Sequence, residues 1–222
     1  MVKSKITSLK DISQYLMLHG SFINNIGLLN GKMGIVLFFF HYSRFTKCKR
    51  YEYFANCMLE EVYEEINTNT PKDFANGLSG IAFGISYLAA NGFVKIDNEV
   101  FDDLDAKIME WDIKKVNDYS LQTGLAGIGS YVLLRFNNEL RQSRLPLSYI
   151  NNLLVSLFES NDPLCIEICQ AIKSNSGVTR LMDNILFRSL PGDKMTKQIV
   201  NIGLINGITG VGLSKIFRGN EK

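Results

Sequence analysis

The sequence predicts an all-α protein made of stacked helical hairpins. Two observations support this prediction: a glycine motif recurs four times along the 222 residues, and apolar residues at helical spacing follow every copy. The segments between the copies also have the pattern of amphipathic helices, which supports the same prediction. Hairpins stacked sideways form either an open solenoid or a closed ring, and these observations leave both arrangements open.

The motif is Asn/Thr-Gly-x-x-Gly-Ile/Val, and its first glycines are 46, 47 and 83 residues apart. The four glycine pairs are Gly31 and Gly34, Gly77 and Gly80, Gly124 and Gly127, and Gly207 and Gly210. The Asn or Thr before each first glycine suits a helix N-cap. A glycine costs a helix roughly 1 kcal/mol relative to alanine, so we expect close approach of neighbouring backbones to require these residues. The last gap is nearly two periods long and has room for one degenerate unit.

Each motif is expected to begin a helix that is apolar nearly all round. The residues that follow the four motifs are IVLFFFHY, IAFGISYLAA, IGSYVLLRF and VGLSKIF. Segments 51–67, 97–111 and 146–160 are predicted to be second helices with one apolar face. The acidic run that includes Glu61 and Glu65 is expected to be a solvated face with mild repulsion between glutamates four apart. The whole chain, 1–222, is expected to be a single domain of such hairpins.

The composition is that of an ordinary globular protein, with 46% apolar residues, 21% charged residues and a net charge of +2. Its scattered basic residues give no reason to expect a nucleic-acid partner. No apolar run approaches the ~20 residues needed to cross a membrane, and the start lacks a signal-peptide pattern. Four cysteines without such a signal predict reduced thiols and a cytoplasmic location.

The repeats resemble those of the lanthionine synthetase C-like (LanC-like) family. The matching segments are GLLNGKMGIVLFFF, NGLSGIAFGISYL, QTGLAGIGSYVLLRF and IGLINGITGVGLSKIF. They cover residues 20–138 and 199–218, whereas 139–198 matches poorly. The resemblance implies an α/α-toroid, or a partial toroid, with Gly-x-x-Gly helix starts. It also implies a role in modifying ribosomally made peptides such as lantibiotics.

Cyclases of this family join a cysteine thiol to a dehydrated serine or threonine, and a zinc ion held by two cysteines and one histidine activates the thiol. The Trp-Cys-x-Gly and Cys-His-Gly motifs that carry these ligands are absent here. We therefore expect neither a metal site nor a cofactor. His19 and His41 lie in the first repeat, far in sequence from Cys165 and Cys169. Those two cysteines, four residues apart on one helix face, are either metal ligands or two small core residues.

Some family cyclases have a proton-handling aspartate four residues before the first glycine of a middle repeat, beside a tyrosine. In the third repeat the tyrosine is Tyr119 and Ser120 stands at the acid position, so we assign both to substrate binding. In the second repeat Asp73 has the same offset and is the candidate catalytic residue. The alternative for Asp73 is a carboxylate that interacts with the helix dipole.

Three functional hypotheses follow, and they leave open whether the chain is an enzyme. The first is a LanC-like protein without zinc, acting as an accessory or precursor-binding protein whose partner is a precursor peptide or a peptide-maturation enzyme. The second is an α/α-toroid enzyme acting on carbohydrate through Asp73 and Asp118, two carboxylates placed before glycine-started helices. The third is an interaction module that forms a homodimer to cover exposed apolar surface.

Overall fold

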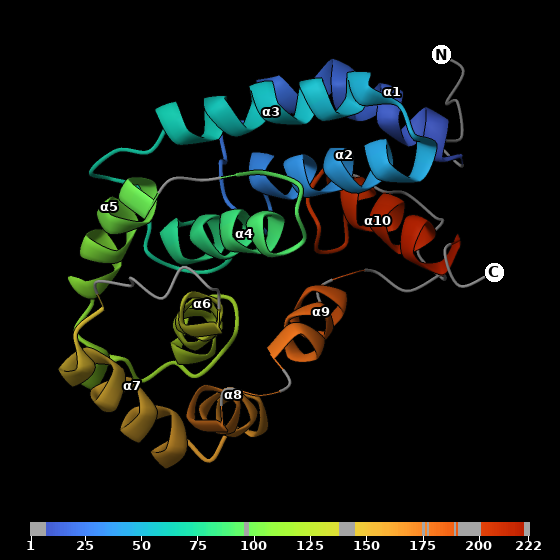
Figure 1. Ribbon diagram of the computed structural model, residues 1–222. Coiled ribbons are helices and arrows are strands. Elements are labelled where there is room, and N and C mark those ends of the chain that lie inside the picture. Colours follow the sequence, from blue (N-terminus) through green and yellow to red (C-terminus); the bar gives the residue numbers. More distant parts are fainter. Residues whose placement is uncertain are drawn as a thin grey trace. The chain divides into compact units, whose positions relative to one another are not determined.

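The computed structural model, shown in Figure 1, describes residues 8–95, 98–137, 145–174, 176, 178–188, 190 and 201–219. Within these residues every named element is a helix, and the only β-type pairing is an isolated bridge between Asn201 and Gly207. The predicted all-α class is therefore confirmed, and the hairpins described below are consistent with an α/α-toroid fold. No helix in the described ranges is long and apolar enough to cross a membrane.

The chain forms two compact units, of which unit 1 joins the two ends of the sequence (Met1–Asn67 with Phe187–Lys222). Its helices are α1 (Leu9–His19), the 3-10 helix η1 (Gly20–Phe22), α2 (Lys32–Thr46), α3 (Lys49–Glu64) and α10 (Ile208–Gly219). Helix α2 lies between α3 and α10, and α1 packs on α10 (Figure 1). The N-terminal helix thus serves as the amphipathic partner of the C-terminal one.

Unit 2 (Thr68–Leu186) has the same plan. Its helices are α4 (Leu78–Ala90), α5 (Asn98–Met109), the 3-10 helix η2 (Ile113–Lys115), α6 (Leu125–Asn137), α7 (Leu147–Glu159), α8 (Pro163–Ser174) and most of α9 (Val178–Arg188). Helix α4 packs on α5 and α6, and α6 packs on α7 and α8. Glycine-started helices therefore contact one another, and each also contacts an amphipathic helix.

The two predicted helix types are confirmed. In α4 every residue from Leu78 to Leu88 is buried, whereas α3 buries only Ala55, Met58 and Val62. The amphipathic helices α3, α5 and α7 match the predicted segments within a few residues. A helix buried on all sides needs apolar residues all round, and a covering helix needs only one apolar face.

Helix α8 lies in the long last gap, where the spacing leaves room for one degenerate unit. It packs against α6, as α4 does, although no glycine motif precedes it. Instead, Oδ1 of Asp162 accepts hydrogen bonds from the N–H groups of Leu164 (2.9 Å) and Cys165 (3.0 Å). A side-chain acceptor thus satisfies the first turn of this helix in place of backbone.

The four motifs begin their helices with one shared backbone geometry. In each, the N–H of the residue after the first glycine donates to the carbonyl seven residues earlier. The bonds are Lys32 N to Asn25 O (2.8 Å), Leu78 N to Pro71 O (2.8 Å), Leu125 N to Asp118 O (2.9 Å) and Ile208 N to Asn201 O (2.9 Å). In the first three motifs a Cβ on the glycine would lie 2.1 to 2.2 Å from that carbonyl oxygen, so only glycine fits.

This geometry corrects the expected N-cap. The N-cap residues of α2 and α4 are Gly31 and Gly77 themselves, and neither helix has a side-chain cap. The carbonyls of the preceding loop meet the first-turn N–H groups, so the Asn before the glycine is not needed for that purpose.

The second glycine of two motifs faces a loop from another repeat. A Cβ on Gly34 would lie 2.8 Å from Cγ of Leu204, and one on Gly127 would lie 2.6 Å from Cβ of Phe74. At these positions the neighbouring loop approaches the glycine through a side chain. Both the motif's own loop and a neighbouring loop therefore require glycine.

Replacing Gly31 with alanine is expected to lower the free energy of unfolding by roughly 2–4 kcal/mol, because the Cβ would overlap the Asn25 carbonyl. Gly20→Ala is the matched control, since Gly20 has helical φ and ψ (−62°, −43°) and a Cβ there meets only the ends of Met58 and Ile35, at 3.3 and 3.4 Å. It should change stability by less than about 1 kcal/mol. Urea unfolding followed by far-UV circular dichroism compares the two, and equal losses would contradict the assignment.

Candidate functional site

The loops that carry the predicted site residues lie side by side in unit 2. The N–H groups of Phe74 and Ala75 both donate to the carbonyl of Gln122, at 3.0 and 2.9 Å. The loop of Asp73 is therefore bonded to the loop that carries Tyr119 and Ser120. The structure thus brings together the loops of all three residues that the sequence selected.

Asp73 is half-buried at the start of the motif. Its Oδ1 accepts a hydrogen bond from Asn76 N–H at 2.7 Å. This contact orders the turn before α4 and places a carboxylate near the positive end of the helix. It is consistent with the alternative, non-catalytic role of Asp73, in which the carboxylate interacts with the helix dipole. A catalytic role for Asp73 stays a prediction.

Ser120 is part of an exposed polar cluster formed by Asp118, Ser120 and Thr123. Asp118 Oδ1 accepts from Ser120 N–H (2.8 Å), and its Oδ2 accepts from Ser120 Oγ (3.1 Å) and from the Thr123 hydroxyl. The hydrogen bond from Thr123, with those from Ser120, holds the pKa of Asp118 below its usual value. Asp118 is therefore ionised at neutral pH and is a weak base.

Tyr119 has a side chain that is 40% exposed, while its backbone faces a buried thiol. The Sγ of Cys165 donates to the Tyr119 carbonyl at 3.5 Å, and the Sγ of Cys169 donates to the Leu154 carbonyl, also at 3.5 Å. Burial raises the pKa of Cys165 to about 11. Both cysteines of α8 are fully buried and act as core residues that hold neighbouring segments.

The residues present do not fit the three-ligand zinc site of the family. Cys165 and Cys169 are buried in α8, and His41 packs on Phe217 with ring centroids 4.8 Å apart. Burial, together with the charge of Arg44, lowers the pKa of His41 to about 3. Among the described His, Cys, Asp and Glu residues, no group of three is placed to hold a metal ion.

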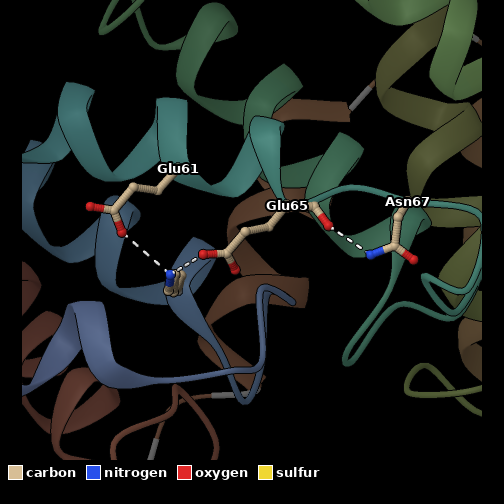
Figure 2. Close-up of polar contacts among 4 residues, drawn as sticks. Glu61, Glu65 and Asn67 are labelled. Carbon is tan, nitrogen blue, oxygen red and sulfur yellow. Dashed lines mark hydrogen bonds and ion pairs between the residues drawn. The ribbon is translucent and has the colours of Figure 1, made fainter.

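Sequence reasoning missed an ion-pair cluster at the start of α2. The Lys32 side chain is only 3% exposed, and its Nζ contacts Glu65 Oε1 at 2.5 Å and Glu61 Oε2 at 3.3 Å. Figure 2 shows the two carboxylates converging on this amine, with Asn67 donating to the Glu65 carbonyl. Burial lowers the pKa of Lys32, but the hydrogen bonds to Glu65 and Glu61 outweigh it and the net pKa is raised. The expected mild repulsion between the two glutamates is thus offset, because they share one cation.

A second missed cluster is buried in unit 2. Asp105 of α5 and Arg135 of α6 are 0% and 1% exposed, and Arg135 Nη2 donates to Asp105 Oδ2 at 2.8 Å. The Tyr131 hydroxyl donates to Asp105 Oδ1, and the guanidinium of Arg135 lies 4.3 Å from the centre of the Phe101 ring. Burial and the Asp105 charge raise the pKa of Tyr131, so its proton stays in place. The cluster holds α5 on α6.

These features define a protein of paired helices with glycine-closed loops. The sequence matches the family model described as Lanthionine synthetase C-like protein over residues 23–179, and the chain belongs to this family. No curated protein and no solved structure matches the chain. The match includes α8, which lies in the stretch where the repeats are hardest to see. The fourth motif lies beyond it, and has the same helix-start hydrogen bond as the other three motifs.

The Asp105→Asn substitution is expected to destabilise the protein by about 3–5 kcal/mol, since it leaves the Arg135 charge buried without a counter-charge. Glu110→Gln is the control, because Glu110 pairs with Lys72 at 2.8 Å but is 66% exposed, and it should cause no measurable change. Thermal unfolding of both variants measures the difference. A loss no larger for Asp105 than for Glu110 would show that the buried pair is unimportant.

Native Cys165 is expected to resist iodoacetamide at pH 8, because a thiol with a pKa near 11 carries almost no thiolate there and is fully buried. Cys48 and Cys57 are only partly buried and should be labelled first. Mass spectrometry of tryptic peptides gives the extent at each site, and unfolding in urea should make Cys165 react. Labelling of native Cys165 as fast as Cys57 would refute this assignment.

Proposed function

We propose that this LanC-like chain acts in the cytoplasm in the maturation of ribosomally made peptides, as a zinc-independent accessory or precursor-binding protein. Family membership supports the peptide substrate class. The arrangement of cysteines and histidines supports the absence of zinc chemistry. The peptide substrate class and the absence of zinc chemistry are therefore supported by different observations.

The observation that carries the proposal is the hydrogen bonding of the α8 thiols. Each thiol donates its proton to a backbone carbonyl, Cys165 to Tyr119 and Cys169 to Leu154. A cysteine bound to zinc is a thiolate and has no proton to donate. Zinc binding would require both thiols to lose a proton and these contacts, and burial, which raises the pKa of Cys165 to about 11, opposes that step.

The paired loops of unit 2 supply groups suited to peptide binding. Tyr119 and Ser120 are exposed, and the ionised Asp118 beside them is a hydrogen-bond acceptor with a full negative charge. An aromatic ring, a hydroxyl and a carboxylate on one loop suit contacts with a peptide that carries basic and polar residues. We assign this loop to substrate binding, with Asp73 on the neighbouring loop.

The carbohydrate-enzyme hypothesis receives less support. A glycosidase of this kind needs one carboxyl group that is protonated at neutral pH and serves as the general acid. Asp118 has a lowered pKa and cannot fill that role. Only Asp73 is left as a candidate acid, so the pair that motivated the hypothesis is incomplete.

The experiment combines metal content, cyclisation and binding. Purified protein is expected to contain no stoichiometric zinc by mass spectrometry of metals, and to leave a dehydrated, cysteine-containing precursor peptide uncyclised with or without added zinc. The same labelled peptide should bind in fluorescence anisotropy. Ser120→Arg should weaken binding by about tenfold, through lost contacts and neutralisation of the Asp118 charge.

Ser176→Arg is the matched control, since Ser176 is exposed and lies on another segment of unit 2. It should bind the peptide like the unchanged protein. Zinc-dependent cyclisation abolished by Cys165→Ala would refute the zinc-independent part of the proposal. Absence of any peptide binding would refute the precursor-binding part.

A further inference from the structure

Helix α7 presents an apolar stripe to solvent in addition to the face that it buries in unit 2. Ile150, Leu153 and Leu157 are buried. On another face of the helix the exposed fractions are 73% for Leu147, 54% for Val155 and 63% for Phe158. Positions 147, 151, 155 and 158 fall on one stripe of an α-helix, with Asn151 as its polar member.

None of the stripe residues is charged, although Nζ of Lys173 from α8 lies 5.4 Å from the centre of the Phe158 ring. No Asp, Glu, Lys or Arg occurs from Leu145 to Phe158, although 21% of the chain is charged. Helices on a water-exposed surface normally place charged residues on their outer face. Depletion of charge around exposed large apolar residues is the compositional mark of an interface core.

We propose that α7 is the contact surface of a homodimer, in which α7 pairs antiparallel with α7 of a second copy across a two-fold axis. In such an interface the same patch must meet itself, so an uncharged stripe avoids the repulsion that any net charge would create. When Leu147 of one copy lies opposite Phe158 of the other, the two-fold symmetry also places Phe158 of the first copy opposite Leu147 of the second. The axis then passes between these two contacts, near the middle of α7.

The charges at the end of the helix fit the antiparallel orientation. Glu159, the last residue of α7, is exposed. At the other end the N-cap is Pro146, and no side chain caps the first turn. Antiparallel pairing brings Glu159 of each copy to the positive N-terminal end of the other, whereas parallel pairing sets Glu159 beside its own equivalent.

Other occupants fit this face less well. A helix that binds a membrane surface has lysine or arginine on its polar face, and α7 has neither. A protein selected by charge would find no charged residue among the four stripe positions, and only Lys173 beside Phe158 at one end. A second copy needs only the apolar, neutral surface that is present. Since one helix pair supplies only part of a standard interface, we expect a dissociation constant in the micromolar range.

The test is sedimentation equilibrium of the full chain over a wide range of concentrations. The unchanged protein should rise from the 25.0 kDa of one chain towards twice that mass. Leu147→Lys and Phe158→Glu should each raise the dissociation constant by at least about tenfold, because a charge then meets an apolar side chain. Phe22→Glu is the control, since Phe22 is 83% exposed in unit 1, and it should dimerise normally.

Mixing the two single variants separates this geometry from any other. In the mixed dimer, the lysine at 147 of one copy meets the glutamate at 158 of the other, and the second contact stays apolar, so dimerisation should return. Far-UV circular dichroism confirms that each variant is folded. A monomer at all concentrations overturns the proposal, as does a mixture no better than its components. Vesicle binding that Phe158→Glu abolishes, without dimerisation, would likewise overturn it.

Discussion

The structure depends on the backbone contact that closes each helix-start loop against its first glycine. The Asn25 carbonyl accepts a hydrogen bond from Lys32 N–H and also occupies the space where Gly31 would carry a Cβ. The loop is thereby held against the first turn of α2. From that position the Leu29 carbonyl accepts from Leu204 N–H at 2.7 Å, which joins the loop before α10 to the loop before α2. One glycine thus positions two helices.

Sequence reasoning found the glycine-started helices because their motif reports a backbone requirement that no other residue meets. It could not resolve α8, whose first turn depends on the Asp162 carboxylate, a common type of cap with no repeat signature. The Asp105–Arg135 pair could not be predicted from the sequence for a different reason. The two residues are 30 apart on different helices, and spacing does not say which charges are buried together.

Asp118 shows why the candidate site could be predicted only in part. Its Oδ1 accepts a hydrogen bond from the N–H two residues later, and Asn25 and Asn201 make the same contact at the same offset from their glycines. Because an asparagine amide oxygen makes this contact in two other repeats, the carboxylate of Asp118 is needed there only as a hydrogen-bond acceptor that shapes the turn. Loop geometry therefore accounts for the position of Asp118, and contact of this loop with a peptide stays a proposal.

The pairing of loops follows one pattern in both units. In unit 1 the loop of the last repeat donates to that of the first, and in unit 2 the loop of the second repeat donates to that of the third, through N–H groups at the same offsets from the glycine. Since the contact is the same, any repeat that keeps its glycine and loop carbonyl can adjoin another.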